Sequence, residues 1–287
     1  MVTLKRRMKS VRSTRQITKA MELISASKMR RSAEATLASR YYAEVALQIL
    51  TDLSHIIDVR AHPLYAVRSV KTRLHIVITS NRGLAGSYNK NVLQLFASHL
   101  KEDEKSGVKS KAILIGRQAG HFGTTVRGLE VVGLYEQLPE KPTTAELSPI
   151  TTTAKQLFTG RTPAVDAVEL VYTRYGSSVL QTASRQPLLP AGFVDGPDST
   201  TPKDSLFEPS KSEVLGVVTE RLIDIQLLQA YLESQASEQS ARMVAMKTAS
   251  DNARDLIDDL TLTSNTLRQA TITGELAEIT AGAEVIL

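Results

Sequence analysis

The chain has 287 residues, of which 42% are hydrophobic, and a formal net charge of +5. It has no cysteine, which excludes disulfides, thiolate catalysis and zinc sites built on cysteine. No apolar run approaches the roughly 20 residues that span a bilayer, and the charged N-terminus lacks the apolar segment of a secretory signal. We therefore expect no membrane insertion.

Proline and glycine divide the chain into regions. All ten prolines lie between Pro63 and Pro209, and the first glycine is Gly83. Because a proline inside a helix costs roughly 3 kcal/mol or more, the two proline-free ends predict two long helices around a compact domain. The predicted parts are a helix over 1–60, a globular domain over 70–190, a linker over 190–209 and a helix over 210–287.

The N-terminal helix, predicted over 3–57, has apolar residues at helical spacing. Steps of three and four residues are typical of a helix with one buried face. We therefore predict that one stripe of side chains is buried, made of Leu4, Met8, Val11, Ile17, Met21, Ile24, Met29, Ala33, Leu37, Tyr41, Val45 and Ile49.

Strand and helix patterns alternate between the two ends. Runs rich in β-branched residues predict strands, and stretches with helical periodicity predict helices. This alternation is typical of a layered, Rossmann-like α/β domain. The predicted strands cover 74–80, 112–116, 129–135, 167–175 and 179–188, and the predicted helices cover 89–104 and 144–159, with a turn or short helix over 116–123.

The C-terminal helix begins at a capping box, in which Ser210 and Glu213 satisfy N–H groups of the first turn. At ~1.5 Å per residue it is far longer than the width of one globular domain. The N-terminal helix is its natural partner, which predicts a long antiparallel coiled coil with the α/β domain inserted at one end. The predicted buried stripe is Met243, Met246, Ala249, Ala253, Leu256, Leu260 and Leu267.

The two terminal helices carry opposite charge. Residues 1–40 hold eleven Lys or Arg and two acids, whereas residues 210–287 hold six Lys or Arg and twelve acids. Opposite charge lets two helices select each other. A basic helix also permits a second interpretation, a coiled-coil scaffold or nucleic-acid-binding protein, although no aromatic side chain lies among its charges to stack on bases.

Signals for catalysis or cofactor binding are weak. The loop 81–87 follows a predicted strand, but it lacks the Gly-Lys-Ser/Thr ending of a phosphate-binding loop. Gly116, Gly120 and Gly123 are not spaced as in the G-x-G-x-x-G motif of dinucleotide-binding folds. The five histidines show no metal spacing, and His75 is predicted to be structural. We predict no catalytic, cofactor or metal site; a nucleotide-binding enzyme is the remaining alternative.

Three long segments resemble the gamma subunit of F-type ATP synthases. Residues 15–30 (RQITKAMELISASKMR) resemble the N-terminal helix of that family, and residues 237–247 (SEQSARMVAMK) with 251–253 (DNA) resemble its C-terminal helix. Residues 268–279 (RQATITGELAEI) resemble its terminal signature, and the predicted strand before residues 81–86 (NRGLAG) also fits. The resemblance covers the chain from end to end and in the same order.

The resemblance implies a non-catalytic role. In this family the gamma subunit is the central rotor shaft, which couples proton-driven rotation of a membrane c-ring to the conformational cycle of catalytic beta subunits. The resemblance implies one copy within a ring of three alpha and three beta subunits, with the α/β domain against the epsilon subunit and the c-ring. It also implies a peripheral membrane protein without cofactor or nucleic acid. No transit peptide is visible, which favours the cytoplasmic face of a bacterial membrane and leaves a processed mitochondrial chain as the alternative.

The resemblance further implies which residues contact the ring of alpha and beta subunits. The first group matches the region near the beta lever segments, the second matches the region near the beta loop that grips the shaft, and a third matches a segment lower down. The last group is an apolar end that suits a hydrophobic sleeve. The first group is Lys19, Met21, Lys28 and Arg30, and the second is Arg268, Gln269 and Thr273. The third is Arg242 alone, and the last is Val285, Ile286 and Leu287.

Gly274 departs from the family pattern, in which a long polar residue is more common at this position. It follows two threonines and an isoleucine, and glycine alone lowers helix stability by ~1 kcal/mol relative to alanine. We predict that packing keeps the helix continuous here, and a break at Gly274 would contradict this.

Overall fold

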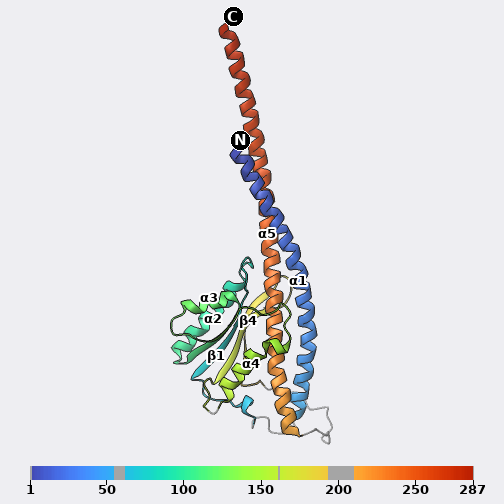
Figure 1. Ribbon diagram of the computed structural model, residues 1–287, viewed down its shortest axis with the longest axis vertical. Helices are drawn as coiled ribbons and strands as arrows, with labels where there is room; N and C mark the ends of the chain where they lie inside the picture. The colour runs from blue at the N-terminus through green and yellow to red at the C-terminus, as the bar shows by residue number, and fades with distance from the viewer. Residues whose placement is uncertain (1, 55–61, 161, 193–209, 287) are drawn as a thin grey trace. The chain divides into compact units, whose positions relative to one another are not determined.

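The computed structural model describes residues 2–54, 62–160, 162–192 and 210–286, and it contains two compact units (Figure 1). Two long helices, α1 (Val2–Ser54) and α5 (Lys211–Ile286), contribute to both units. One unit, Met1–Ala26 with Arg242–Leu287, is formed by end segments of these helices. The other, Ser27–Ala241, adds an α/β domain to the remaining helical segments. The predicted fold class is thereby confirmed.

The α/β domain is built on a five-stranded sheet in the order β3-β2-β1-β4-β5. Strands β1 to β4 are parallel, and β5 is antiparallel to β4. All five predicted strands are confirmed, and the stretch over 116–123 is a helix. The strands are β1 (Thr72–Ile78), β2 (Lys109–Ile115), β3 (Glu130–Tyr135), β4 (Ala167–Tyr175) and β5 (Gln181–Leu189); the helices are η2 (Pro63–Tyr65), α2 (Tyr88–Lys105), α3 (Arg117–Thr125) and α4 (Thr144–Thr159).

Side chains of the sheet alternate between two apolar layers, as the period of a strand requires. On one face Leu74 and Ile76 belong to a cluster with Phe158 of α4 and with residues of α5. On the other face Val77 packs in a cluster with Phe96 of α2. Burial of each such side chain contributes roughly 1.5–3 kcal/mol, so the sheet is fixed between helices on both faces.

Within the unit that contains the domain, α1 and α5 run antiparallel. Arg40 of α1 lies 3.2 Å from Glu233 of α5. Further along α1, Leu50 shares a cluster with Leu215 and Leu222, which precede Glu233 in the sequence. Residue numbers therefore rise along one helix as they fall along the other, which confirms the antiparallel pairing predicted from the sequence.

The predicted start of α5 is also present. The backbone N–H of Glu213 donates a hydrogen bond to Ser210 Oγ at 3.2 Å, which is the half of the capping box that satisfies the first turn. The predicted end of the first helix, 55–57, and most of the linker, 193–209, lie outside the described residues.

The predicted buried stripe of α1 is wrong over much of its length. Apart from Ala43 and Leu50 near the end of the helix, the buried side chains described for α1 are instead small and polar. They recur at steps of three, four and seven residues: Thr18, Ser25, Ser32, Thr36 and Ser39. Six members of the predicted stripe are 39–66% exposed, namely Ile17, Ile24, Leu37, Tyr41, Val45 and Ile49.

The helix itself explains how these hydroxyl groups can be buried. Thr18 Oγ1 donates to the carbonyl of Arg15 at 3.0 Å, and Thr36 Oγ1 donates to that of Ser32 at 2.9 Å. Such local bonds satisfy a buried hydroxyl without a partner on another element. Small side chains also shorten the distance between packed helices, so the larger apolar residues of α1 are left on its exposed face.

We expect this arrangement to invert the usual effect of hydrophobicity on stability. Replacing Ser25 with Leu is expected to lower the free energy of unfolding by about 1–3 kcal/mol, because Ser25 is 2% exposed and a larger side chain overpacks the seam. Replacing Ile24 with Ser, one residue earlier, is expected to cost under about 0.5 kcal/mol because Ile24 is exposed. Urea unfolding of both variants compares their free energies of unfolding. A larger loss in Ile24→Ser than in Ser25→Leu would contradict the close packing of α1 along its small, polar buried side chains.

The predicted stripe of α5 is partly correct. Met246, Ala253 and Leu260 are buried, whereas Leu267 is 46% exposed. Ser250 and Ile257 are also buried, although they were not part of the predicted stripe. Together the five buried positions follow steps of four and three residues, the heptad spacing of a coiled coil.

Candidate functional site

The C-terminal part of α5 is an exposed helical surface. Every residue over 265–279 is exposed, including the apolar Ile272 and Leu276. The helix continues through Gly274 as predicted, but a side chain at Gly274 would meet no atom within 4 Å. The packing predicted for this position is therefore not supplied by the described residues. Because a helix segment rich in threonine has little intrinsic stability, this surface is suited to support by another protein.

Three predicted contact residues lie on this surface. Arg268, Gln269 and Thr273 are all exposed, and Thr273 Oγ1 donates to the carbonyl of Gln269 at 2.9 Å. Arg268 forms no ion pair with a described residue, so its charge is available to a partner. The side chains of Val285, Ile286 and Leu287 lie outside the described part of the chain.

The α1 segment of the same unit contributes a basic groove of about 550 Å³. Lys19, a predicted contact residue, lies on its wall and pairs with Glu22 at 3.0 Å, while Met21 is half-buried nearby. Charged groups around an apolar floor favour an acidic partner that carries apolar side chains. The lining residues are Arg12, Arg15, Gln16, Lys19, Ala20, Leu23 and Ile257.

The remaining predicted contact residues differ in accessibility. Lys28 forms an ion pair with Glu140, and Arg30 is exposed. Arg242, at the start of the α5 segment of the helical unit, is only 7% exposed. Contact between these residues and other subunits stays a prediction, with Arg242 the least accessible of the set.

Sequence reasoning missed one candidate surface. In the unit that contains the domain, α1 exposes a stripe that the sequence analysis assigned largely to the core. The signal was present as steps of four residues, but periodicity does not distinguish a face buried within a chain from one that a partner covers. This outer apolar stripe consists of Leu37, Tyr41, Tyr42, Val45 and Ile49.

The first turn of α3, where a phosphate would bind in a nucleotide-binding fold, is occupied by the chain itself. The backbone N–H of Arg117 donates to Asn81 Oδ1 at 3.0 Å, and that of Ala119 donates to Thr79 Oγ1 at 2.9 Å. The N–H of Gln118 donates to the Ser80 carbonyl at 3.2 Å. Since such donors are the groups that hold phosphate at a helix N-terminus, the N–H groups of Arg117, Gln118 and Ala119 are already engaged within the chain.

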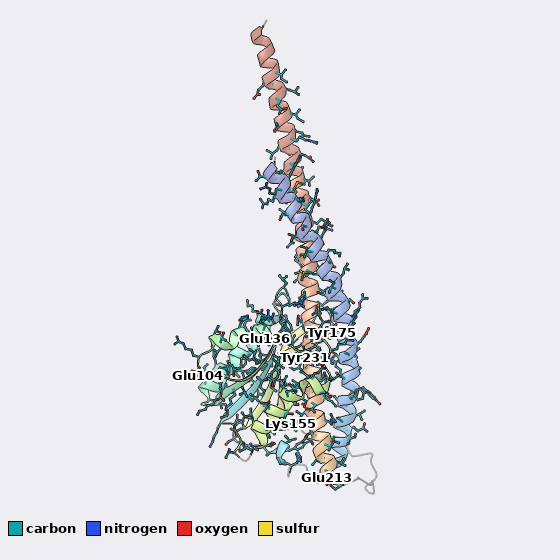
Figure 2. The ribbon with its side chains drawn as sticks, in the orientation of Figure 1. Glu104, Glu136, Lys155, Tyr175, Glu213 and Tyr231 are labelled. Atoms are coloured by element: carbon teal, nitrogen blue, oxygen red, sulfur yellow. The ribbon has the colours of Figure 1, made fainter. Side chains whose placement is uncertain are left out.

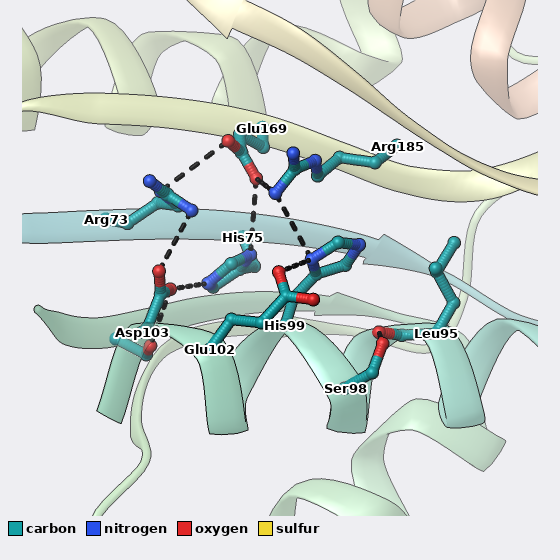
Figure 3. A network of polar contacts seen from close by, with 10 residues as sticks. Arg73, His75, Leu95, Ser98, His99, Glu102, Asp103, Glu169 and Arg185 are labelled. Carbon is teal, nitrogen blue, oxygen red and sulfur yellow. Dashed lines mark hydrogen bonds and ion pairs between the residues drawn. The ribbon is translucent and has the colours of Figure 1, made fainter. Parts of the chain in front are cut away.

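A buried polar network lies under α2 (Figure 3). His75 is completely buried, and its Nε2 lies 2.9 Å from Asp103 Oδ2. Arg73 Nη1 lies 2.9 Å from the other oxygen of Asp103, and Arg73 Nε lies 3.5 Å from Glu169 of β4. The network extends to Arg185 of β5, whose Nη1 is 3.8 Å from Glu169. With Ser110 of β2, the network joins α2 to β1, β2, β4 and β5, which confirms the structural role predicted for His75.

The network determines the charge of Asp103. Burial opposes ionisation of this carboxyl, but the hydrogen bond from His75 and the positive charge of Arg73 outweigh it, so the pKa of Asp103 is below its ordinary value of 3.8. The carboxylate is therefore the acceptor, and His75 Nε2–H and Ser110 Oγ–H donate to it.

Polar contacts also fasten the domain to α5, and Figure 2 labels Lys155 and Tyr231, two of the residues that make them. Lys155 of α4 lies 3.5 Å from Glu220 and 3.7 Å from Asp224, both on α5. Tyr231 donates its hydroxyl to the carbonyl of Pro139 at 3.1 Å, and burial raises the pKa of Tyr231 to about 12. This tyrosine therefore remains a neutral donor at physiological pH.

No described helix combines the length and apolar character needed to cross a bilayer. Among the described residues there is also no group of three or more His, Asp or Glu side chains placed to hold a metal ion.

Comparison with known proteins gives a consistent result. A family model described as ATP synthase matches residues 1–286. The ATP synthase gamma chain of Acidithiobacillus ferrooxidans is 39% identical, over 97% of this chain and 96% of that protein. The gamma chain of Moorella thermoacetica is 37% identical, over 99% of this chain and 98% of that protein.

Solved structures share the fold. A chain of the mitochondrial ATP synthase of Euglena gracilis, from its OSCP, F1 and c-ring assembly, is similar with a TM-score of 0.68 and 19% identity, over 99% of this chain and 93% of that chain. A chain of the central stalk and c-ring of the Tetrahymena thermophila enzyme has a TM-score of 0.60 and 21% identity, over 82% and 99% of the two chains. With the full-length sequence matches, these findings show that the chain belongs to the ATP synthase gamma-chain family.

Proposed function

We propose that this chain is the central rotor shaft of an F-type ATP synthase. In this role it catalyses no reaction, and its rotation imposes successive conformations on the catalytic beta subunits. The observation that carries the proposal is the exposed end of α5 over 265–279, a helical segment that needs a surrounding partner. Membership of the gamma-chain family supports the same role.

The proposed complex contains one copy of this chain within three alpha and three beta subunits. The α/β domain is proposed to contact the epsilon subunit and the membrane c-ring, on the cytoplasmic face of a bacterial membrane. Similarity to chains of assemblies that include F1 and a c-ring supports the proposed partners.

Torque is proposed to pass through charged contacts that form and break as the shaft turns. Exposed ion pairs are individually weak and screened by salt, so they transmit force without locking the shaft in one position. The proposed contact residues are Lys19, Met21, Lys28, Arg30, Arg242, Arg268, Gln269 and Thr273, with Val285, Ile286 and Leu287 as an apolar bearing.

Charge reversal at Arg268 tests the proposed contact. In the reconstituted complex, Arg268→Glu is expected to lower ATP hydrolysis about tenfold, because an attraction to an acidic group on beta becomes a repulsion. The matched control is Lys90→Glu, the same change of charge sign at an exposed residue of α2, which is expected to leave turnover unchanged. Equal turnover in both variants, with both complexes assembled, would exclude a torque contact at Arg268.

A further inference from the structure

One ring nitrogen in the polar network under α2 has two neighbours that it cannot bond at the same time (Figure 3). His99 Nδ1 lies 3.1 Å from Glu102 Oε2 and 3.2 Å from Arg185 Nη1. A guanidinium only donates hydrogen bonds and an ionised carboxylate only accepts them, whereas Nδ1 donates when it carries a proton and accepts when it does not. The nitrogen therefore bonds to Arg185 or to Glu102, but not to both.

The charge of His99 decides which of the two bonds forms. In the neutral ring Nδ1 accepts from Arg185, and the single ring proton is on Nε2. In the charged ring Nδ1–H donates to Glu102, and the positive charge of the ring repels the guanidinium. Because Arg185 is on β5 whereas Glu102 is on α2 itself, only the neutral ring links the helix to the strand.

A second acceptor for Arg185 is already in place. Glu169 Oε2 of β4 is buried, forms no hydrogen bond with a described residue, and lies 3.8 Å from Arg185 Nη1. His75 Nδ1, 4.0 Å from the same oxygen, is likewise without a hydrogen-bond partner among the described residues. A guanidinium that His99 releases therefore reaches a carboxylate oxygen with a small movement, and it then bonds to the neighbouring strand instead of to the helix.

The other charged groups of the network are engaged elsewhere. Asp103 of α2 is held by Arg73 and His75 of β1, each at 2.9 Å. Strand β2 and helix α3 also pack in the cluster beneath α2, but neither contains an acidic residue, and none of their described basic residues is hydrogen-bonded to His99. The His99 side chain is 10% exposed, so protons reach it from water. Glu102 and Arg185 are thus the groups that respond to its charge.

We propose that His99 is a pH-sensitive switch that fastens α2 to β5, the edge strand of the sheet. Histidine is the side chain that changes charge between pH 5 and pH 8. At pH 8 the neutral ring accepts from Arg185, and the helix is linked to the strand. At pH 5 the charged ring donates to Glu102, and Arg185 turns to Glu169. The switch lies within the α/β domain and does not depend on the proposed rotor role.

Nitrogen NMR of the full chain, labelled with ¹⁵N in histidine, tests the proposal. The spectrum of His99→Gln identifies the His99 signals, and wild-type Nδ1 is expected to be unprotonated at pH 8 and protonated at pH 5. Arg185→Met removes the donor to the neutral ring and is expected to raise the titration midpoint of His99 by about half a pH unit. Glu102→Ala removes the acceptor of the charged ring and is expected to lower the midpoint by about the same amount.

A double-mutant cycle measures the link itself. In urea unfolding, His99→Gln and Arg185→Met are expected to show a favourable coupling of about threefold in the unfolding constant at pH 8 and none at pH 5. The control is Arg174→Met, the same replacement at an exposed residue of β4, which is expected to leave the midpoint of His99 unchanged.

The wild-type spectra decide the outcome even where a variant does not fold. An Nδ1 that keeps one protonation state from pH 8 to pH 5 would overturn the proposal. Midpoints that move in the same direction in Arg185→Met and Glu102→Ala, or a coupling that is equal at the two pH values, would also overturn it.

Discussion

Replacing Asp103 with Ala is expected to lower the free energy of unfolding by about 3–5 kcal/mol at pH 7. The variant leaves His75 and Arg73 without the carboxylate that both contact at 2.9 Å, and His75 is completely buried. Removing one partner of a buried charged pair is costly because the other keeps its desolvation penalty. Equilibrium unfolding in urea measures the difference.

The neighbouring residue provides a matched control. Glu102 is on the same helix turn, but its side chain is 63% exposed and contacts only the edge of the network through His99. Glu102→Ala is expected to cost under about 1 kcal/mol. Equal losses in the two variants would contradict the role assigned to Asp103.

The same carboxylate predicts a dependence on pH. Because its pKa in the folded protein is lowered, Asp103 stabilises the fold above its unfolded pKa, near 3.8, and this stabilisation is lost as the pH falls through the folded pKa. The difference in stability between the wild type and Asp103→Ala is therefore expected to be full at pH 7 and to shrink below about pH 4. A difference that stays constant down to pH 2 would contradict the lowered pKa.

Replacing Glu233 with Gln is expected to cost about 2–3 kcal/mol. Glu233 is 2% exposed, and its carboxylate accepts hydrogen bonds from Arg40 of α1 at 3.2 Å and from the backbone N–H of Tyr175 at 3.3 Å. It therefore joins both long helices to the carboxyl end of β4. Glutamine keeps the shape but loses the charge and one acceptor, and the partial exposure of Arg40 limits the loss.

Glu220→Gln on the same helix is the control for this variant. The side chain of Glu220 is 61% exposed and lies 3.5 Å from Lys155, so an effect under about 0.5 kcal/mol is expected. Unfolding of the two variants in urea gives the comparison. If Glu233→Gln were no more destabilising than Glu220→Gln, the contact would not be a joint between the helices and the domain.

The sequence predicted the elements of this fold well, because their signals are local. Proline-free ends, β-branched runs and the capping residue Ser210 each act within a few residues, and the helices and strands lie where these signals place them. The buried face of α1 could not be predicted in the same way. Periodicity located the apolar face correctly, but Leu37 and Tyr41 are exposed while Ser32 and Thr36 are buried.

The reason is that burial depends on the partner and not only on the residue. The seam of α1 needs small side chains for close approach, and local hydrogen bonds satisfy its hydroxyls. Apolar residues recur at the same intervals along a helix whether their face is buried within the chain or covered by another subunit. The groove lined by Lys19 and Ile257 could not be predicted either, because its residues come from two helices that are far apart in the sequence.

The rotor role is tested most directly by assembly with the alpha and beta subunits of the same organism, followed by the mass and the ATP hydrolysis rate of the purified product. The proposed function predicts one copy of this chain for three alpha and three beta subunits, with a turnover that the chain alone lacks. A chain that stays folded and monomeric beside those subunits, without associating, would contradict the role of a central shaft.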